Sequence, residues 1–267
     1  MKRRQAIKIS SIAAISASAS ISSSCSKNEF SFNHGVASGD PLEDRVILWT
    51  RVTPSKSGPL NVILEISKNR KFSDLIFVKK LQTSSLEDYT LKYDFLANKY
   101  CDGNAGFFYR FRAGDVISEI GQSRTFSNNT KKVKIGIFSC SNYPAGYFNA
   151  YQTAAEKNDL DLWLHLGDYL YEYPMGGYAT GSAEKLGREP NPSHEMITLS
   201  DYRLRHAQYK LDQGSQALHK NAPLIAVWDD HEFSNDTWKH GAENHSETGS
   251  EGDFYTCLLY TSPSPRD

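Results

Sequence analysis

Between residues 130 and 256, short apolar segments alternate with stretches of helical periodicity. Three segments have the length and composition of buried strands: residues 133–138, 160–166 and 223–228. Residues 146–156 carry aromatic and small side chains at helical spacing, and Ser200 with Asp201 resembles the capped start of a second helix. Strands joined by helices favour a mostly parallel sheet. The sequence therefore predicts an α/β domain over residues 130–256.

Residues 30–129 have a different pattern, made of short strands and turns. The expected strands are residues 45–52, 61–66, 75–81, 107–112 and 116–120. Turn residues frame the first of them at 38–41 and 53–54. Short strands at intervals of roughly a dozen residues predict an all-β sandwich of the immunoglobulin-like type. Nothing in this region carries chemistry, so its expected role is packing or forming one wall of a site.

The charge balance and the cysteine content exclude several classes of protein. Thirty basic and 31 acidic side chains leave a formal charge of −1, so no nucleic-acid-binding surface and no acidic membrane partner is indicated. Four cysteines are too few for a disulfide framework.

Residues 1–29 are typical of an export signal. A basic start, Lys2-Arg3-Arg4, precedes a weakly apolar run that is too short and too polar to span a bilayer. The paired arginines favour twin-arginine export, with an ordinary secretory signal as the alternative. Cys25 loosely matches a lipoprotein cleavage site, so it is either a lipid anchor or removed with the signal. We therefore expect export machinery as a partner, and a location in the periplasm or at the cell surface.

The tail, residues 257–267, resembles the in-frame translation of an adapter used in sequencing libraries. We exclude it from the fold on this interpretation; the alternative is a genuine tail. On the adapter interpretation the natural chain continues beyond residue 256.

Three predicted strands end in side chains that can bind a metal. Cys140 follows the first, Asp168 and Tyr171 follow the second, and Asp230 and His231 follow the third. Alone, a cysteine there is usually a small buried hydrophobe and Gly-Asp is usually a turn. However, ligands bind at the carboxyl ends of strands in α/β sheets. Crowded acidic groups also repel one another unless a cation compensates. The sequence therefore predicts a metal site.

Several longer motifs carry a resemblance to a known family. Residues 139–143, 165–172, 201–203 and 227–232 with Asn235 resemble the alkaline phosphatase D family of calcineurin-like metallophosphoesterases, and residues 34–41 and 49–51 resemble its N-terminal β domain. The resemblance implies an exported, metal-dependent phosphoester hydrolase, either an alkaline phosphatase or a phosphodiesterase. Its α/β metallophosphoesterase domain would be incomplete in this chain.

The resemblance also implies iron(III) and calcium as cofactors. Cys140, Asp168 and Tyr171 would hold the iron, while Asp168 would bridge to calcium, which Asp230 and Asn235 would also bind. The ligand chemistry agrees, because thiolate and phenolate suit a highly charged transition metal and carboxylate and amide oxygens suit calcium.

The implied reaction is in-line attack on phosphorus by a metal-bound hydroxide. His231 would protonate the leaving oxygen or stabilise the transition state; alternatively it only orients a carboxylate. Arg203 either contacts the phosphate or forms a surface ion pair. Asn142, Asp229 and Glu232 are expected to support the ligands without binding metal.

No further ligand is identifiable after His231, because His240 and His245 lie in a polar stretch that resembles a loop. We therefore expect this chain as written to be inactive or weakly active. Two alternatives stay open: an envelope-anchored binding module with a structural metal and no turnover, and a hydrolase for another ester. The sequence does not choose between phosphomonoesters and phosphodiesters.

Overall fold

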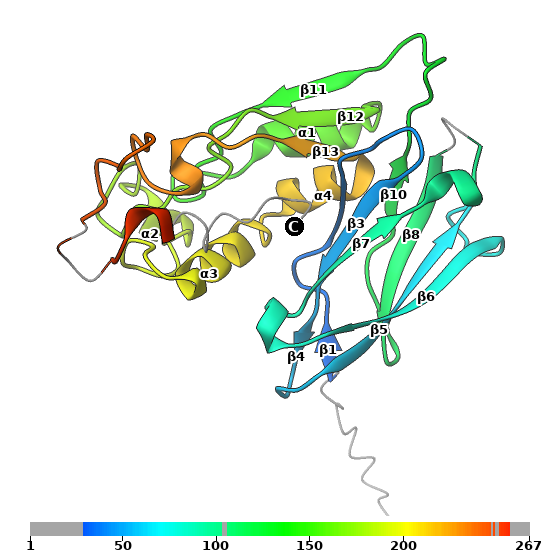
Figure 1. The fold of residues 1–267 in the computed structure, drawn as a ribbon, viewed down its shortest axis with the longest axis horizontal. Coiled ribbons are helices and arrows are strands. Elements are labelled where there is room, and N and C mark those ends of the chain that lie inside the picture. The colour runs from blue at the N-terminus through cyan, green and yellow to red at the C-terminus, as the bar shows by residue number, and fades with distance from the viewer. Residues whose placement is uncertain (1–28, 103–105, 247, 249–250, 257–267) are drawn as a thin grey trace, which may run out of the picture.

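The computed structural model describes residues 29–102, 106–246, 248 and 251–256. Figure 1 shows an all-β part beside a part in which helices cover a sheet. The predicted signal with Cys25 and the predicted adapter-like tail lie outside the described residues. Within the described ranges, no helix has the length and apolar character needed to cross a membrane.

The all-β part is a sandwich of antiparallel sheets. One sheet has the strand order β10 (Gly121–Arg124), β8 (Gly106–Ala113), β5 (Leu60–Ser67) and β6 (Leu75–Thr83), with β9 (Val116–Ile117) beside β8. Facing it are β2 (Val36–Gly39), β3 (Val46–Arg51) and β7 (Thr90–Phe95). A small ribbon pairs β1 (Phe30–Ser31) with β4 (Thr53–Pro54). Two short 3-10 turns are η1 (Ser85–Glu87) and η2 (Ala97–Lys99).

One apolar core fills the space between these sheets. On β8, Phe107, Tyr109 and Phe111 point into it, while Arg110 and Arg112 lie on the opposite side. Arg110 there binds Glu65 on β5 at 2.7 Å. The strand predicted at residues 107–112 is therefore confirmed, and the alternation along it follows from the period of two in a strand.

The predicted parallel strands are confirmed, but their sheet contains more strands than the sequence indicated. β11 (Ile135–Phe138), β12 (Leu162–His165) and β13 (Leu224–Ala226) pair in parallel, and the sheet then continues through β2, β3 and β7. Leu224 pairs with Gly39, and Asp40 N–H donates to the Leu224 carbonyl at 2.9 Å. The assignment of Ser38 and Gly39 to a turn was wrong, because pairing on both edges holds them in β2.

Two helices cover one face of the parallel strands. α1 (Asn149–Lys157) and α4 (Gln213–Asn221) pack on Trp163 of β12. α2 (Ala183–Leu186) and α3 (Leu199–Tyr209) come between α1 and α4 in the chain (Figure 1). The cap of α3 is Thr198, not Ser200: Thr198 and Asp201 each bind the other's backbone N–H. α4 was not predicted, because Gly214 and Ser215 weaken its helical pattern.

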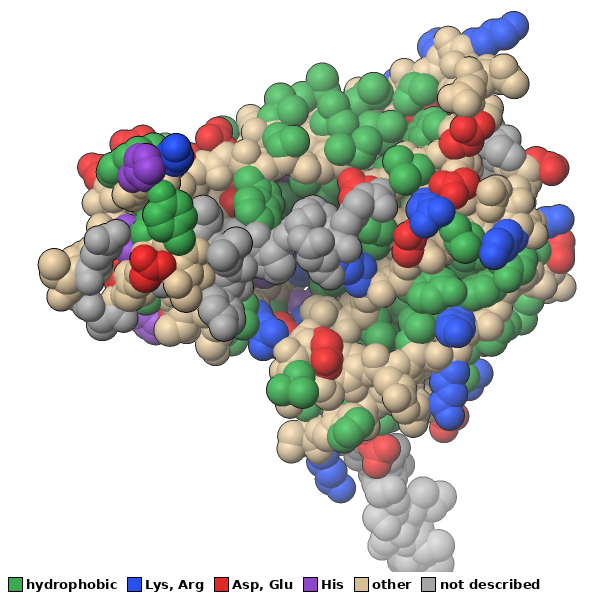
Figure 2. Space-filling view, in the orientation of Figure 1, with side chains coloured by type: hydrophobic (Ala, Val, Ile, Leu, Met, Phe, Trp, Pro, Cys, Tyr) green, Lys and Arg blue, Asp and Glu red, His purple; other side chains and the backbone are tan. Residues whose placement is uncertain are grey.

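Among the described residues, no helix covers the other face of the parallel strands, which we call the bare face. Its exposed apolar side chains are Ile135, Ile137, Leu166, Val227 and Trp228. Figure 2 shows hydrophobic side chains gathered over β11 and β12. Because parallel sheets usually have both faces covered, an exposed apolar face is unusual for such a sheet.

At the junction of the two parts, side-chain contacts supplement the shared sheet. Gln216 of α4 donates to the Asn33 carbonyl at 2.8 Å. Lys220 of α4 forms an ion pair with Glu119 at 2.8 Å. These contacts fix how the helices lie against the sandwich.

Candidate metal centre

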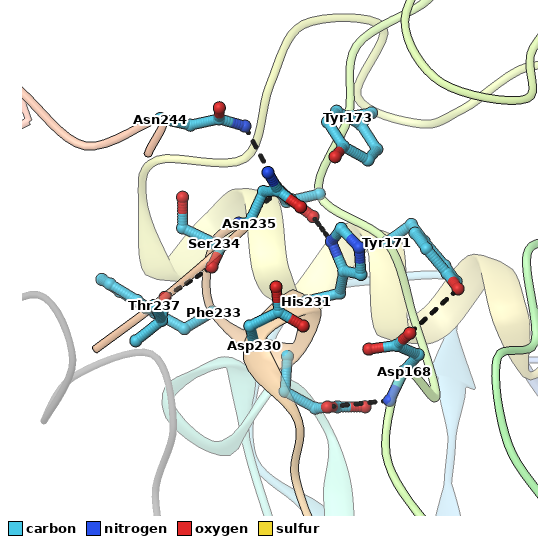
Figure 3. Close-up of polar contacts among 12 residues, drawn as sticks. Asp168, Tyr171, Tyr173, Asp230, His231, Phe233, Ser234, Asn235, Thr237 and Asn244 are labelled. Carbon is cyan, nitrogen blue, oxygen red and sulfur yellow. Dashed lines mark hydrogen bonds and ion pairs between the residues drawn. The ribbon is translucent and has the colours of Figure 1, made fainter. Parts of the chain in front are cut away.

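The carboxyl ends of β11, β12 and β13 bring five predicted side chains together. Asp168, Asp230 and His231 each offer one ligand atom, and these atoms lie within 4.8 Å of one another. Cys140 Sγ and the Tyr171 hydroxyl both approach Asp168 Oδ2, at 3.4 and 3.1 Å. Figure 3 shows Asp168, Tyr171, Asp230 and His231 pointing toward one shared region. These positions are those expected for ligands at the end of an α/β sheet.

The backbone is strained at the first two strand ends. Cys140 and Asp168 both have left-handed backbone, with φ of 59° and 53°. Cys140 N–H donates to the Gly167 carbonyl at 3.1 Å, and Ser141 N–H donates to the Asp168 carbonyl at 2.9 Å. Such conformations cost about 1–3 kcal/mol each and persist where surrounding structure enforces them. The two loops are therefore locked together in the conformation that presents the thiol and the carboxylate.

The Asp168 carboxylate has the character of a cation ligand. It is 9% exposed, and its Oδ1 has no hydrogen-bond partner among the described residues. A buried carboxylate oxygen without a partner is unfavourable by about 1–3 kcal/mol or more. A bound cation would remove that penalty, so the residues present fit a metal.

Tyr171 supplies a hydroxyl that holds its proton strongly. Burial, followed by the charge of Asp168 and the hydrogen bond to it, raises the pKa of Tyr171 above its ordinary value. Conversion to phenolate therefore requires a strong positive charge nearby.

His231 is held by a buried carboxylate behind it. Glu172 is fully buried, and its Oε2 lies 2.8 Å from His231 Nδ1. Burial alone lowers the pKa of His231, but the hydrogen bond to Glu172 and the charges of Glu172, Asp230 and Asp168 outweigh it, so the pKa is raised.

Glu232 clamps two of the loops to each other. Its carboxylate accepts from the N–H groups of Asp168 at 3.1 Å, Asp229 at 2.7 Å and Tyr169. Burial raises the pKa of Glu232, although these three N–H groups oppose the shift. Asp229 caps the short turn η3 (Asp230–Glu232), accepting from Asp230 N–H at 3.0 Å. Both residues therefore act on the backbone that carries the ligands.

The remaining predicted site residues have hydrogen-bond partners outside the converging ligand set. Asn235 donates its side-chain amide to Glu243 and its backbone N–H to Glu172. Asn142 accepts from Ala145 N–H at 3.1 Å. Arg203 donates to the Leu86 carbonyl at 2.7 Å, which places its guanidinium against the sandwich. In the described ranges, these three side chains form no hydrogen bond with Asp168 or Asp230.

Glu172 is the site residue to which sequence reasoning gave no role. It follows Tyr171 directly, within a run of tyrosines. A lone carboxylate in such an apolar run needs a partner if it is buried, and that was the available signal.

Comparisons with known proteins agree across both parts of the chain. Residues 16–127 match the model described as "PhoD-like phosphatase, N-terminal domain", and residues 135–258 match "PhoD-like phosphatase". Alkaline phosphatase D of Bacillus subtilis (strain 168) is 36% identical over 224 residues, covering 78% of this chain and 36% of the relative.

A solved structure described as "Structure of PhoD" has the same fold. It superposes with a TM-score of 0.75 at 32% identity, over 86% of this chain and 43% of the solved chain. The chain therefore spans well under half the length of both relatives.

Proposed function

Because the chain belongs to the PhoD-like phosphatase family, we propose that it is part of an exported, metal-dependent phosphoester hydrolase. The activity would be that of an alkaline phosphatase or phosphodiesterase. One observation carries the proposal: Asp168, Asp230 and His231 converge at the ends of parallel strands, around a buried carboxylate oxygen with no partner in the described residues.

The proposed cations are iron(III) and calcium. Cys140, Asp168 and Tyr171 would hold iron, and Asp168, Asp230 and Asn235 would hold calcium. Because burial and the charge of Asp168 raise the pKa of Tyr171, binding as phenolate would require a cation of high charge on its side. When bound, such cations supply an activated water and offset the charge that develops on the phosphoryl oxygens.

The protein's own groups would orient the substrate and move protons. His231 would stabilise the transition state from the side opposite Glu172. Arg203 would contact the phosphate only after leaving the Leu86 carbonyl. Asn142, Asp229 and Glu232 would keep the ligand loops in place.

We infer the finer architecture and location on the same basis. Residues 30–129 would be an immunoglobulin-like domain and residues 130–256 an incomplete metallophosphoesterase domain. Residues 1–29 would direct export to the periplasm or cell surface, with Cys25 either a lipid anchor or removed with the signal.

We further propose that this chain turns over weakly by itself. Calcium takes about 6–8 oxygen ligands, and the converging side chains are too few to fill two coordination spheres. Residues 30–256 should be assayed beside an extended natural chain. Comparable turnover by the two would contradict this part of the proposal.

Colour and substrate range test the proposed function. Protein loaded with Fe³⁺ and Ca²⁺ should absorb visible light, because thiolate and tyrosinate bound to ferric iron are coloured. It should hydrolyse para-nitrophenyl phosphate or its bis-ester and spare a carboxylic ester, and chelation should remove the activity. A colourless protein that binds only calcium would indicate a binding module, and preference for the carboxylic ester would indicate another hydrolase.

A further inference from the structure

We propose that Glu172 is a positioning residue that fixes His231 as the Nδ1–H tautomer and aims its Nε2 lone pair at Asp168 and Asp230. The inference deepens the proposed function and rests on the same centre. The Glu172 carboxylate acts on the converging ligand atoms only through the His231 ring and the backbone.

The surroundings of Glu172 determine which imidazole nitrogen carries the proton. Its Oε2 lies 2.8 Å from His231 Nδ1, and its Oε1 accepts from Asn235 N–H at 2.8 Å and from Asn244 Nδ2 at 3.4 Å. An ionised carboxylate only accepts hydrogen bonds. The nitrogen facing it must therefore donate, which leaves the lone pair of the neutral ring on Nε2.

The imidazole has little freedom to escape this arrangement. Its centroid lies 4.3 Å from that of Tyr171 and 5.3 Å from that of Tyr173. His231 is 9% exposed and Glu172 is fully buried. Figure 3 shows the ring between the carboxylate contact on one side and Asp168 and Asp230 on the other. Nε2 is therefore the nitrogen available to the converging ligand set.

Two buried glutamates divide the support of the centre. Glu232 holds the backbone N–H groups of Asp168 and Asp229, so it acts on the position of the loops. Glu172 holds a side-chain ring and the N–H of Asn235. Glu172→Gln keeps an acceptor for the Asn235 N–H, so it should alter the chemistry of one ligand while the loops keep their places.

The tautomer is measurable on the wild-type chain without added metal. ¹⁵N chemical shifts of the neutral His231 ring should show a protonated Nδ1 and an unprotonated Nε2. Glu172→Gln should populate both tautomers, because an amide can donate as well as accept. Glu184→Gln, at an exposed acid in α2, is the matched control and should leave the shifts unchanged. A protonated Nε2 on the neutral ring of the wild-type chain would overturn the proposal, even if the variants fail to fold.

A double-mutant cycle tests whether Glu172 acts through His231. Glu172→Gln should weaken Co²⁺ binding about 10–100-fold, as loss of such a partner does at other metal centres. In a His231→Ala background the same change should have little further effect. Equal losses in both backgrounds would mean a merely structural role and would reject the proposal. Correct tautomer shifts with no binding of Co²⁺, Fe³⁺ or Ca²⁺ would reject the proposed function and leave the Glu172–His231 inference standing.

Discussion

The sandwich core and the metal centre both contain buried side chains, but the chemistry of these side chains differs. The core contains apolar side chains from two sheets, such as Leu64 and Phe111. The centre contains buried charged or ionisable groups, including Glu172, Glu232 and His231. Apolar burial stabilises the fold at about 25 cal/mol per Å², whereas buried charges stay tolerable only through specific partners.

This difference separates two uses of burial. In the core, stability is spread over many contacts, so a position accepts any apolar side chain of suitable size. In the centre, each oxygen and N–H has a particular partner, so a small change alters chemistry. The four predictions below test that contrast, from the largest expected effect to the smallest.

Truncating the core should give the largest loss. Phe111→Ala removes a ring that is fully buried between the sheets, so it should lower the free energy of unfolding by about 3–5 kcal/mol. Urea unfolding measures the change. Arg112→Ala, at the next residue but on the opposite face of β8, is the control and should lose less than about 1 kcal/mol. Similar losses would show that the core is not the main source of stability.

Low pH should lower the stability of the fold through His165, a buried residue at the end of β12. Burial, and then the charge of Lys210, lowers the pKa of His165 from 6.5 to about 4. Between these values the unfolded chain binds more protons than the folded chain, so stability falls as pH drops from about 6.5 to about 4. The full loss is about 3 kcal/mol.

Unfolding at several pH values checks this window. His165→Gln should reduce the slope, because the ring that contacts Tyr151 and Ser141 no longer titrates. The lowered pKa values of His34 and His219 should keep part of the slope. His240→Gln, at an exposed histidine, should leave the slope unchanged. An unaltered slope in His165→Gln would assign the acid sensitivity elsewhere.

Gly167→Ala should disturb the ligand loops with a moderate loss. Gly167 has φ of 105°, and an added Cβ would lie 2.5 Å from Asp229 Cβ. We expect a loss of about 1–3 kcal/mol, together with weaker cation binding, measured by thermal unfolding and by Co²⁺ titration. Gly181→Ala has open space around its Cβ and should change neither property.

The bare sheet face should respond least. Ile137→Ser replaces an exposed side chain on β11, so the free energy of unfolding should change by no more than about 0.5 kcal/mol. Self-association, measured by light scattering, should decrease because the apolar patch shrinks. Phe138→Ser, on the helix-covered face, should instead destabilise the chain.

The local patterns predicted much of the fold, because they reflect local physics. The period of two on β8 and the apolar runs at β11, β12 and β13 placed strands where the structure has them. β2 and α4 could not be found in this way. Gly39 takes its strand conformation from distant partners, and Gly214 sits in α4 through tertiary packing.

The candidate site divides along the same line. Cys140, Asp168 and Asp230 follow strands directly, so their convergence followed from topology. The hydrogen bond from His231 to Glu172 joins residues 59 positions apart, and nothing in the local sequence specifies that pair. Likewise, the contact of Arg203 with Leu86 depends on how α3 meets the sandwich.

The pairing of β2 with β13 has a consequence for synthesis. Leu224 leaves the ribosome about 185 residues after Gly39, which is roughly ten to forty seconds at ordinary elongation rates. Until then one edge of β2 has no parallel neighbour, and an open strand edge can pair with another nascent chain. β2 is therefore synthesised early but gains its parallel neighbour late. That neighbour, β13, is followed directly by the loop that carries Asp230.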